Sequence, residues 1–275
     1  MAKPLPDIPL HFTTLGSESL PRIIFLHGFL GSGSDWLPIA RKLEKDYCSV
    51  MVDLPGHGSA GIEDGAAAAE GYFERTVEAL AERVRQVASP PCRLVGYSMG
   101  GRIALALLLR HPALFSQALI VSASPGLRTQ EERVARRSSD ECVARKIERN
   151  FAGFLDAWYR APLFSTLKHH PVFREVERER KHNDPRNLAL ALRFLGTGNQ
   201  PSMWDALPEN RVPVHFFAGE KDERYVEIAR QMVKLCPGSD CEILPSCGHA
   251  LQLENRELFV KRLQLFFKQQ EPLRL

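Results

Sequence analysis

The chain of 275 residues, 44% of them hydrophobic, is long enough to bury one large core and to carry an inserted subdomain. Its formal net charge of +3 argues against a general nucleic-acid-binding protein. Residues 1–16 contain three prolines and no apolar stretch of the kind that a secretory signal needs. The longest apolar run, residues 103–109, falls far short of the roughly 20 residues that a helix needs to cross a bilayer. We therefore expect a cytoplasmic protein that does not associate with membranes.

Short apolar runs alternate with helical patterns through the first 124 residues. The predicted strands are residues 22–26, 47–52, 93–97 and 116–122. The predicted helices are residues 72–87 and 99–110, and we expect the alanine-rich residues 66–69 to begin a helix. Because buried strands joined by helices pair as parallel sheets with crossover connections, this part of the chain predicts an α/β fold.

The strand pattern stops at residue 125, where a long charged segment with helical periodicity begins. Its aromatic anchors are Phe151, Phe154, Trp158, Tyr159 and Phe164. A segment of this length is not a plain loop, so we predict a helical cap of residues 125–200 inserted into a core of residues 1–124 and 201–275. The cap holds fifteen Arg and Lys against ten Asp and Glu, whereas the rest of the chain has twenty-one against twenty-three. The excess positive charge therefore lies in the cap.

The alternation of strand and helix resumes after the cap. The predicted strands there are residues 214–218 and 241–244, and the predicted helices are residues 224–235 and 256–268. The whole pattern predicts a mostly parallel central sheet with helices on both faces and a helical cap insertion.

Residues 96–100, GYSMG, match the G-x-S-x-G turn that presents a nucleophilic serine between a strand and a helix. The glycines suit this turn because it is sharp and leaves no room for a side chain on either side of Ser98. The alternative is that Ser98 only caps the following helix. The position of the motif, after an apolar strand and before an apolar helix, favours the nucleophile.

Two later loops carry candidate partners for this serine. Asp222 follows one predicted strand in the motif GEKD, and His249 follows the next in the motif CGH. Both lie just beyond the carboxyl ends of strands, where open α/β sheets place their sites. We therefore predict a triad of Ser98, His249 and Asp222. Glu220 is the rival acid, and the spacing after the strand favours Asp222.

The end of the first apolar strand, HGF, supplies a candidate oxyanion hole. The predicted donors are the backbone N–H groups of Phe29 and Met99, and loss of one such donor typically costs about 2.7 to 4 kcal/mol of transition-state stabilisation. His27 and His57 belong to no cluster of metal ligands. We treat both as structural and predict neither a metal nor a cofactor.

The six cysteines form no C-x-x-C pair, and a chain of this length does not need disulfides to be stable. We expect most of them to be reduced thiols in the core. Cys247 lies two residues before His249, but nothing near it in the sequence would lower its pKa, so we do not expect it to be a nucleophile.

The motifs HGF, DLPGHGS, GYSMGGR, GEKD and CGH together resemble the α/β-hydrolase family over nearly the whole sequence outside the cap. Within that family, GYSMGGR with the cap stretches PGLRTQEERVARRSSD and DAWYRAPLF is similar to the 2-succinyl-6-hydroxy-2,4-cyclohexadiene-1-carboxylate synthases, lyases of menaquinone biosynthesis. The cap stretches are the specific part, because caps diverge widely among hydrolase families. The resemblance implies the α/β-hydrolase fold and a small substrate with several carboxylates, from which pyruvate is eliminated.

The resemblance also implies the residues that bind this polyanion. Arg102 follows Ser98 by one helical turn, and Arg136 matches an arginine of the family's cap. Arg180 matches a second cap arginine, with Arg178 as the alternative register. Arginine suits the task because it stays charged and binds carboxylates through two parallel hydrogen bonds.

Tyr97 and Trp158 would form walls of the substrate site or donate hydrogen bonds to it. Each cap arginine can instead belong to a solvated helix face with nearby glutamates. We favour that interpretation for Arg128, Arg133, Arg137 and Arg145. For Arg102 we favour a functional role, because a charge beside a buried turn needs a partner.

Three functions are compatible with these residues. In a lyase, His249 deprotonates Ser98, whose alkoxide removes a ring proton while Asp222 orients the imidazole. In a serine hydrolase, either a carboxylesterase or a carbon–carbon bond hydrolase acting on a small acidic substrate, the same triad would attack a carbonyl. A non-catalytic binding protein of the same fold is disfavoured because all three triad residues are present. We make no prediction of an oligomeric state.

Overall fold

A computed structural model describes residues 7–62, 71–88 and 90–268 of the chain. Its seven strands form one sheet in the order β1-β3-β2-β4-β5-β6-β7, in which β1 is antiparallel to β3 and the other neighbours are parallel. The strands are β1 (His11–Leu15), β2 (Arg22–Leu26), β3 (Cys48–Asp53), β4 (Cys92–Tyr97), β5 (Phe115–Val121), β6 (Val214–Gly219) and β7 (Ser239–Leu244). The mostly parallel sheet expected from the sequence is confirmed.

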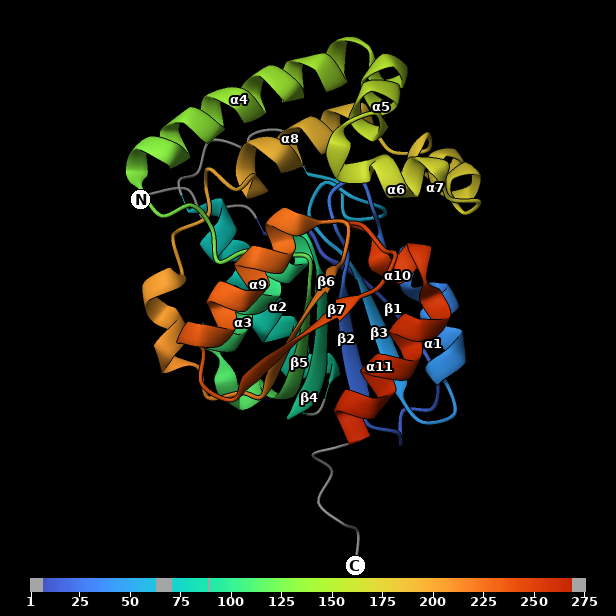
Figure 1. Ribbon diagram of the computed structural model, residues 1–275, viewed down its shortest axis with the longest axis vertical. Helices are drawn as coiled ribbons and strands as arrows, with labels where there is room; N and C mark the ends of the chain where they lie inside the picture. Colours follow the sequence, from blue (N-terminus) through green and yellow to red (C-terminus); the bar gives the residue numbers. More distant parts are fainter. Residues whose placement is uncertain (1–6, 63–70, 89, 269–275) are drawn as a thin grey trace, which may run out of the picture.

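Helices cover both faces of this sheet (Figure 1). One face packs against α2 (Tyr72–Val87), α3 (Met99–Arg110) and α9 (Glu223–Leu235), and the other against α1 (Leu37–Leu43) and α11 (Arg256–Lys268). Alternate residues of one strand serve the two layers, because successive side chains of a strand point to opposite faces. In β2, Ile24 and Leu26 join the first layer and Ile23 and Phe25 the second.

Short connecting helices complete the core. They are η1 (Gly33–Trp36), η3 (Pro112–Leu114), η5 (Trp204–Glu209) and α10 (Leu251–Glu254). Among the residues with described positions, no helix has both the length and the apolar character needed to cross a membrane.

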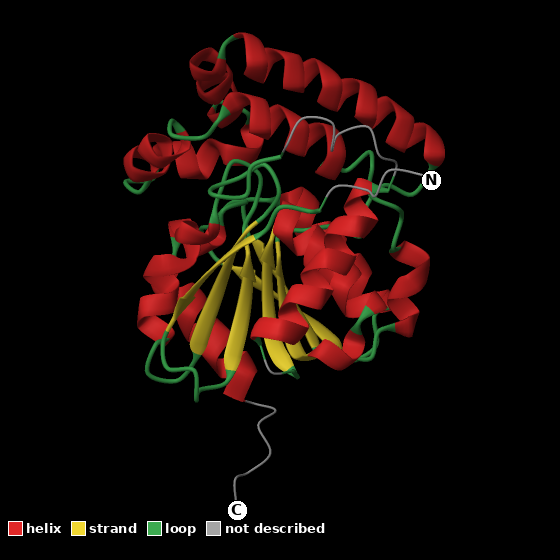
Figure 2. Ribbon diagram, turned by 180° about the vertical axis from the view of Figure 1, so that it is seen from behind, coloured by secondary structure: helices red, strands yellow, loops and turns green. Residues whose placement is uncertain are grey.

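The segment between β5 and β6 folds into helices that lie across one end of the sheet (Figures 1 and 2). They are α4 (Gln130–Arg149), α5 (Phe151–Tyr159), η4 (Pro162–Phe164), α6 (Ser165–His169), α7 (Phe173–Arg180) and α8 (Pro185–Leu195). Thr129 begins α4 with a capping box, in which its side chain accepts from the Glu132 N–H and the Glu132 side chain accepts from the Thr129 N–H.

These cap helices share an apolar cluster of their own, which includes Phe154, Leu155 and Leu192 and reaches the core at Leu30 and Ala250. The loops at the carboxyl ends of the strands gather between the sheet and these helices (Figure 2). The helices fall inside the range 125–200, and the boundary between cap and core stays a prediction.

Most predicted elements agree with the structure to within two residues, and three helices, α2, α3 and α11, have the predicted bounds. Sequence reasoning missed β1 because this edge strand is largely exposed and carries no apolar run. It also missed α1, which spans only seven residues. The helix start expected at residues 66–69 lies outside the described residues.

Candidate active site

Ser98 occupies a sharp turn between β4 and α3. Its backbone has φ 50° and ψ −108°, a positive-φ conformation that non-glycine residues seldom adopt. The Ser98 N–H donates to the Val121 carbonyl at 2.9 Å, and the Gly100 N–H donates to the His27 carbonyl at 2.9 Å. A Cβ at Gly100 would overlap the carbonyl oxygens of Leu26 and His27. The glycine therefore allows the turn to pack directly on the end of β2.

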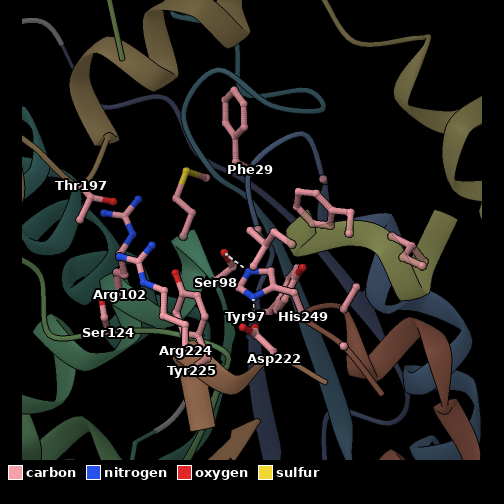
Figure 3. A pocket seen from close by; sticks show the side chains of 18 of the residues that line it. Phe29, Tyr97, Ser98, Arg102, Ser124, Thr197, Asp222, Arg224, Tyr225 and His249 are labelled. Atoms are coloured by element: carbon pink, nitrogen blue, oxygen red, sulfur yellow. Dashed lines mark hydrogen bonds and ion pairs between the residues drawn. The ribbon is translucent and has the colours of Figure 1, made fainter. Parts of the chain in front are cut away.

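The side chains of the three predicted triad residues lie in contact (Figure 3). His249 Nε2 is 3.1 Å from Ser98 Oγ, and His249 Nδ1 is 2.7 Å from Asp222 Oδ2. The carboxylate accepts from Nδ1–H, which leaves Nε2 free to accept the serine proton. His249 and Asp222 are 2% and 6% exposed, so the contact between these two side chains is shielded from water.

The loops that carry Asp222 and His249 are joined by a backbone hydrogen bond. The Lys221 N–H donates to the Cys247 carbonyl at 2.8 Å. The side chain of Glu220, the rival acid, is exposed and accepts from the Ser246 N–H at 3.0 Å. Asp222, and not Glu220, is therefore the carboxylate in contact with the imidazole.

A cavity of about 510 Å³ opens above Ser98 between the sheet and the cap. One side of it is aromatic: the rings of Phe29 and Trp158 are 5.6 Å apart, and Phe164 meets the His249 ring edge-on at 5.8 Å. Arg102 lies on another side of the cavity (Figure 3). The cavity therefore combines an apolar wall with a fixed positive charge.

Phe29 and Met99 line the same cavity as Ser98. Met99 is the first residue of α3 after the turn, and Phe29 follows Gly28 at the end of β2. A Cβ at Gly28 would lie 3.4 Å from Ser98 Cβ, so the two backbone segments are close neighbours. This placement is compatible with the expected oxyanion donors, which stay a prediction.

Arg102 is 8% exposed and its guanidinium is held by neutral partners. One nitrogen donates to Gln200 Oε1 at 2.8 Å and another to the Leu195 carbonyl at 2.7 Å. Burial lowers the pKa of Arg102 to about 10, so it remains a cation near neutral pH. Among the described residues it forms no ion pair with a carboxylate, and a buried cation of this kind attracts an anionic ligand.

Comparison with known proteins shows the family of the chain. A family model described as the alpha/beta hydrolase family matches residues 23–262. This chain belongs to the alpha/beta hydrolase family.

Several known proteins are similar to the chain over most of its length. A Bacillus subtilis protein named putative 2-succinyl-6-hydroxy-2,4-cyclohexadiene-1-carboxylate synthase is 33% identical over 255 residues, 91% of this chain and 92% of that protein. The chloroplastic protein PHYLLO of Arabidopsis thaliana is 33% identical over 257 residues, although the match covers 88% of this chain and only 15% of PHYLLO. The solved structure of MenH from S. aureus has a TM-score of 0.88 at 30% identity and covers 95% of this chain and 98% of that one.

In this member of the alpha/beta hydrolase family the first cap arginine expected at the site, Arg136, also lines the cavity. Its Nε donates to Asp140 Oδ1 at 2.7 Å, one helical turn further along α4. Burial raises the pKa of Asp140, and the charge of Arg136 opposes that shift. Arg136 therefore reaches the cavity with its charge partly balanced.

The second cap arginine at the cavity is Arg180, and Arg178 does not line it. Arg180 binds Asp35 through two parallel hydrogen bonds of 2.7 and 2.6 Å. Burial alone would lower the pKa of Arg180, but the charge of Asp35 and hydrogen bonds to Asp35 and Tyr159 outweigh it and raise the pKa above its usual value. Arg178 is exposed and pairs with Glu179 at 3.2 Å.

Tyr97 and Trp158, the two expected wall residues, both line the cavity. The Tyr97 ring lies 5.5 Å from the His249 ring, and burial raises the pKa of its hydroxyl well above the usual value. The hydroxyl is therefore a neutral donor near pH 7.

Sequence reasoning missed two neighbours of Asp222 that border the cavity, Arg224 and Tyr225. The Tyr225 ring lies 4.7 Å from the His249 ring, and the Arg224 side chain lies near that of Arg102 (Figure 3). The sequence could have indicated them, since both follow shortly after GEKD. The first turn of a helix that starts at the end of a strand faces the same site as Asp222, which precedes it.

The histidines that were expected to be structural are bonded within the core. The Leu54 N–H donates to His27 Nε2 at 3.0 Å, and the Leu30 N–H donates to His57 Nε2 at 3.3 Å. Burial lowers the pKa of His27 to about 4 and that of His57 to about 3. Both rings are therefore neutral near pH 7 and hold the loops that frame Phe29.

Cys247 is 2% exposed, and burial raises the pKa of its thiol to about 11. The thiol is therefore protonated near neutral pH, as expected for a side chain that is not a nucleophile.

Proposed function

We propose that this protein eliminates pyruvate from 2-succinyl-5-enolpyruvyl-6-hydroxy-3-cyclohexene-1-carboxylate, giving 2-succinyl-6-hydroxy-2,4-cyclohexadiene-1-carboxylate, a step of menaquinone biosynthesis. The observation that carries the proposal is the extent of the match to relatives named for this synthase, which spans 91% of the chain in one case. A match of that length includes most of the cap. The cap supplies Arg136, Trp158 and Arg180 to the cavity and so shapes its choice of substrate.

The charges of the cavity support a substrate with several carboxylates. Five Arg and Lys side chains line it against three Asp and Glu. Asp222 bonds to His249 and Asp35 binds Arg180, so both of these carboxylates already have partners. Arg102 has no carboxylate partner among the described residues, and it lies one helical turn from Ser98. We assign it to a substrate carboxylate, which it can bind through parallel hydrogen bonds.

In the proposed mechanism His249 takes the hydroxyl proton of Ser98, and the alkoxide removes a proton from a ring carbon of the substrate. The electron pair of that C–H bond forms one new ring double bond, the pair of the existing ring double bond moves one position along the ring, and the C–O bond to the enolpyruvyl group breaks. The proton held by His249 passes to the leaving group, whose enol form tautomerises to pyruvate. Ser98 ends the cycle as a hydroxyl and forms no covalent intermediate.

Asp222 has two tasks in this scheme. Its hydrogen bond to Nδ1 fixes the imidazole tautomer with Nε2 toward Ser98, and its charge balances the imidazolium. We assign the backbone N–H groups of Phe29 and Met99 to the oxygen of the succinyl carbonyl, where negative charge develops when the ring proton leaves.

A pyruvate assay with the enolpyruvyl substrate tests the proposal. Wild-type protein should release one pyruvate per substrate, and Ser98→Ala should lose that activity. Full activity in Ser98→Ala would refute the role of the serine.

The rival function is hydrolysis of an acidic ester or of a carbon–carbon bond. It is supported by the Ser98–His249 contact, which is the one that a serine hydrolase uses. Fast turnover of p-nitrophenyl esters without release of pyruvate would favour the hydrolase over the lyase.

A further inference from the structure

One carboxylate connects the cap to the loop that carries the imidazole. Glu254, the last residue of α10, accepts a hydrogen bond from the Gly248 N–H at 2.7 Å through Oε2. Its other oxygen, Oε1, accepts from the Thr166 hydroxyl at 3.1 Å. Gly248 directly precedes His249, and Thr166 lies in α6 of the cap. A single side chain therefore bonds both the cap and the backbone beside the proposed base.

The cap packs so closely on this loop that there is no room for a side chain at Gly248. A Cβ at Gly248 would overlap the Thr166 hydroxyl. A Cβ at Gly219, the last residue of β6, would likewise overlap the Gly248 carbonyl. The loop is thus packed against both the strand end that leads to Asp222 and the cap, and Glu254 accepts the hydrogen bond of its Gly248 N–H.

The same part of the cap also touches the imidazole. Phe164, two residues before Thr166, meets the His249 ring edge-on at 5.8 Å. His249 must keep Nε2 within hydrogen-bond distance of Ser98, and a misplacement of about 1 Å in a site of this kind costs roughly a hundredfold in rate. A contact that fixes the base to a fraction of an ångström therefore contributes to the rate through Glu254, which does not itself line the cavity.

We propose that Glu254 and Thr166 are positioning residues, through which the cap holds His249 against Ser98. Thr166 orients the Glu254 carboxylate, the carboxylate fixes the Gly248 N–H, and the Gly248 backbone fixes the base. The inference rests on the proposed role of His249. It assigns a second task to the cap, which places the base in addition to binding the substrate.

Removal of the Thr166 hydroxyl at constant shape tests this connection. Thr166→Val should lower kcat about tenfold with KM within about twofold of wild type, and Thr166→Ser, which keeps the donor, should restore most of the rate. Thr14→Val, an exposed threonine of β1, is the matched control. Thermal unfolding of each variant separates a misplaced base from a loss of fold.

The Glu254 end of the connection has its own pair of variants. Glu254→Ala should lose at least as much kcat as Thr166→Val. Glu254→Gln should recover most of it, because the amide oxygen can accept from the Gly248 N–H and the amide NH₂ can donate to the Thr166 hydroxyl. Glu257→Ala, at an exposed glutamate of α11, is the control. Thr166→Val combined with Glu254→Ala should be no slower than Glu254→Ala alone, because both changes break one connection.

The rate at which a fluorophosphonate labels Ser98 provides a second readout that needs no substrate. Labelling should slow in Thr166→Val and Glu254→Ala in parallel with kcat. If wild type is labelled but releases no pyruvate, the proposed lyase reaction fails while the labelling rates still decide the positioning roles. The inference is overturned if Thr166→Val keeps the wild-type kcat and labelling rate, if only KM changes, or if the two substitutions have additive effects.

Discussion

Replacement of Arg102 gives the sharpest test of how the substrate is recognised. The guanidinium donates from two nitrogens to Gln200 Oε1 and the Leu195 carbonyl, which lie 98 and 93 residues further along the chain. Arg102→Lys keeps the charge but cannot reproduce this planar fork, and Arg102→Met removes the charge altogether. A hydrogen bond between charged groups contributes about 1.5 to 3 kcal/mol. We therefore expect kcat/KM for pyruvate release to fall roughly tenfold to a hundredfold in Arg102→Lys and further in Arg102→Met.

The same substitution has a cost in stability, because it leaves buried acceptors unpaired. One unsatisfied buried acceptor costs about 1 to 3 kcal/mol, so thermal unfolding is measured alongside activity. Arg110→Lys, at the end of the same helix α3, is the matched control and should change neither quantity appreciably. If a folded Arg102→Met retains kcat/KM within twofold of wild type, the substrate carboxylate does not bind at Arg102 and our reasoning about the cavity is wrong.

Three further predictions concern the fold around the site. Gly100→Ala should lower the melting temperature and abolish activity, because its methyl group would overlap backbone carbonyls at the end of β2; an unchanged melting curve would contradict the packing described. The pKa values of His27 and His57 are lower in the folded protein than in an unfolded chain. The stability that depends on the two neutral imidazoles is therefore fully present above about pH 6.5. The free energy of unfolding falls as the pH drops toward 4, by up to about 1.4 kcal/mol per pH unit for each histidine. Urea unfolding at pH 7, 6 and 5 should show a shallower loss in His57→Gln than in wild type, and equal slopes would disprove the assignment. Arg180→Met should destabilise the fold by roughly 3 kcal/mol, because it leaves the partly buried Asp35 unpaired, whereas Arg178→Met should have little effect; equal losses in denaturant unfolding would contradict the described pairing of Arg180 with Asp35.

The sequence by itself determined the alternation of strand and helix and the choice of Ser98, His249 and Asp222 as the predicted triad. These features are local: a buried strand is a short apolar run, and the G-x-S-x-G turn needs its glycines within five consecutive residues. Asp222 and His249 could be placed because each follows a strand of a parallel sheet, and the carboxyl ends of such strands meet at one edge. The side chains of all three are in contact in the structure.

The tertiary structure alone decided which charges at the site are free and which are balanced. Arg102 and Arg180 look alike in the sequence, yet Arg180 binds Asp35 while Arg102 is held by an amide and a carbonyl. The contacts of Glu254 with Gly248 and Thr166 were equally hidden, since Thr166 lies 88 residues away in the chain. Periodicity reports whether a position is buried, but the partner of a buried polar group is chosen by the packing of distant segments, and no local pattern encodes that choice.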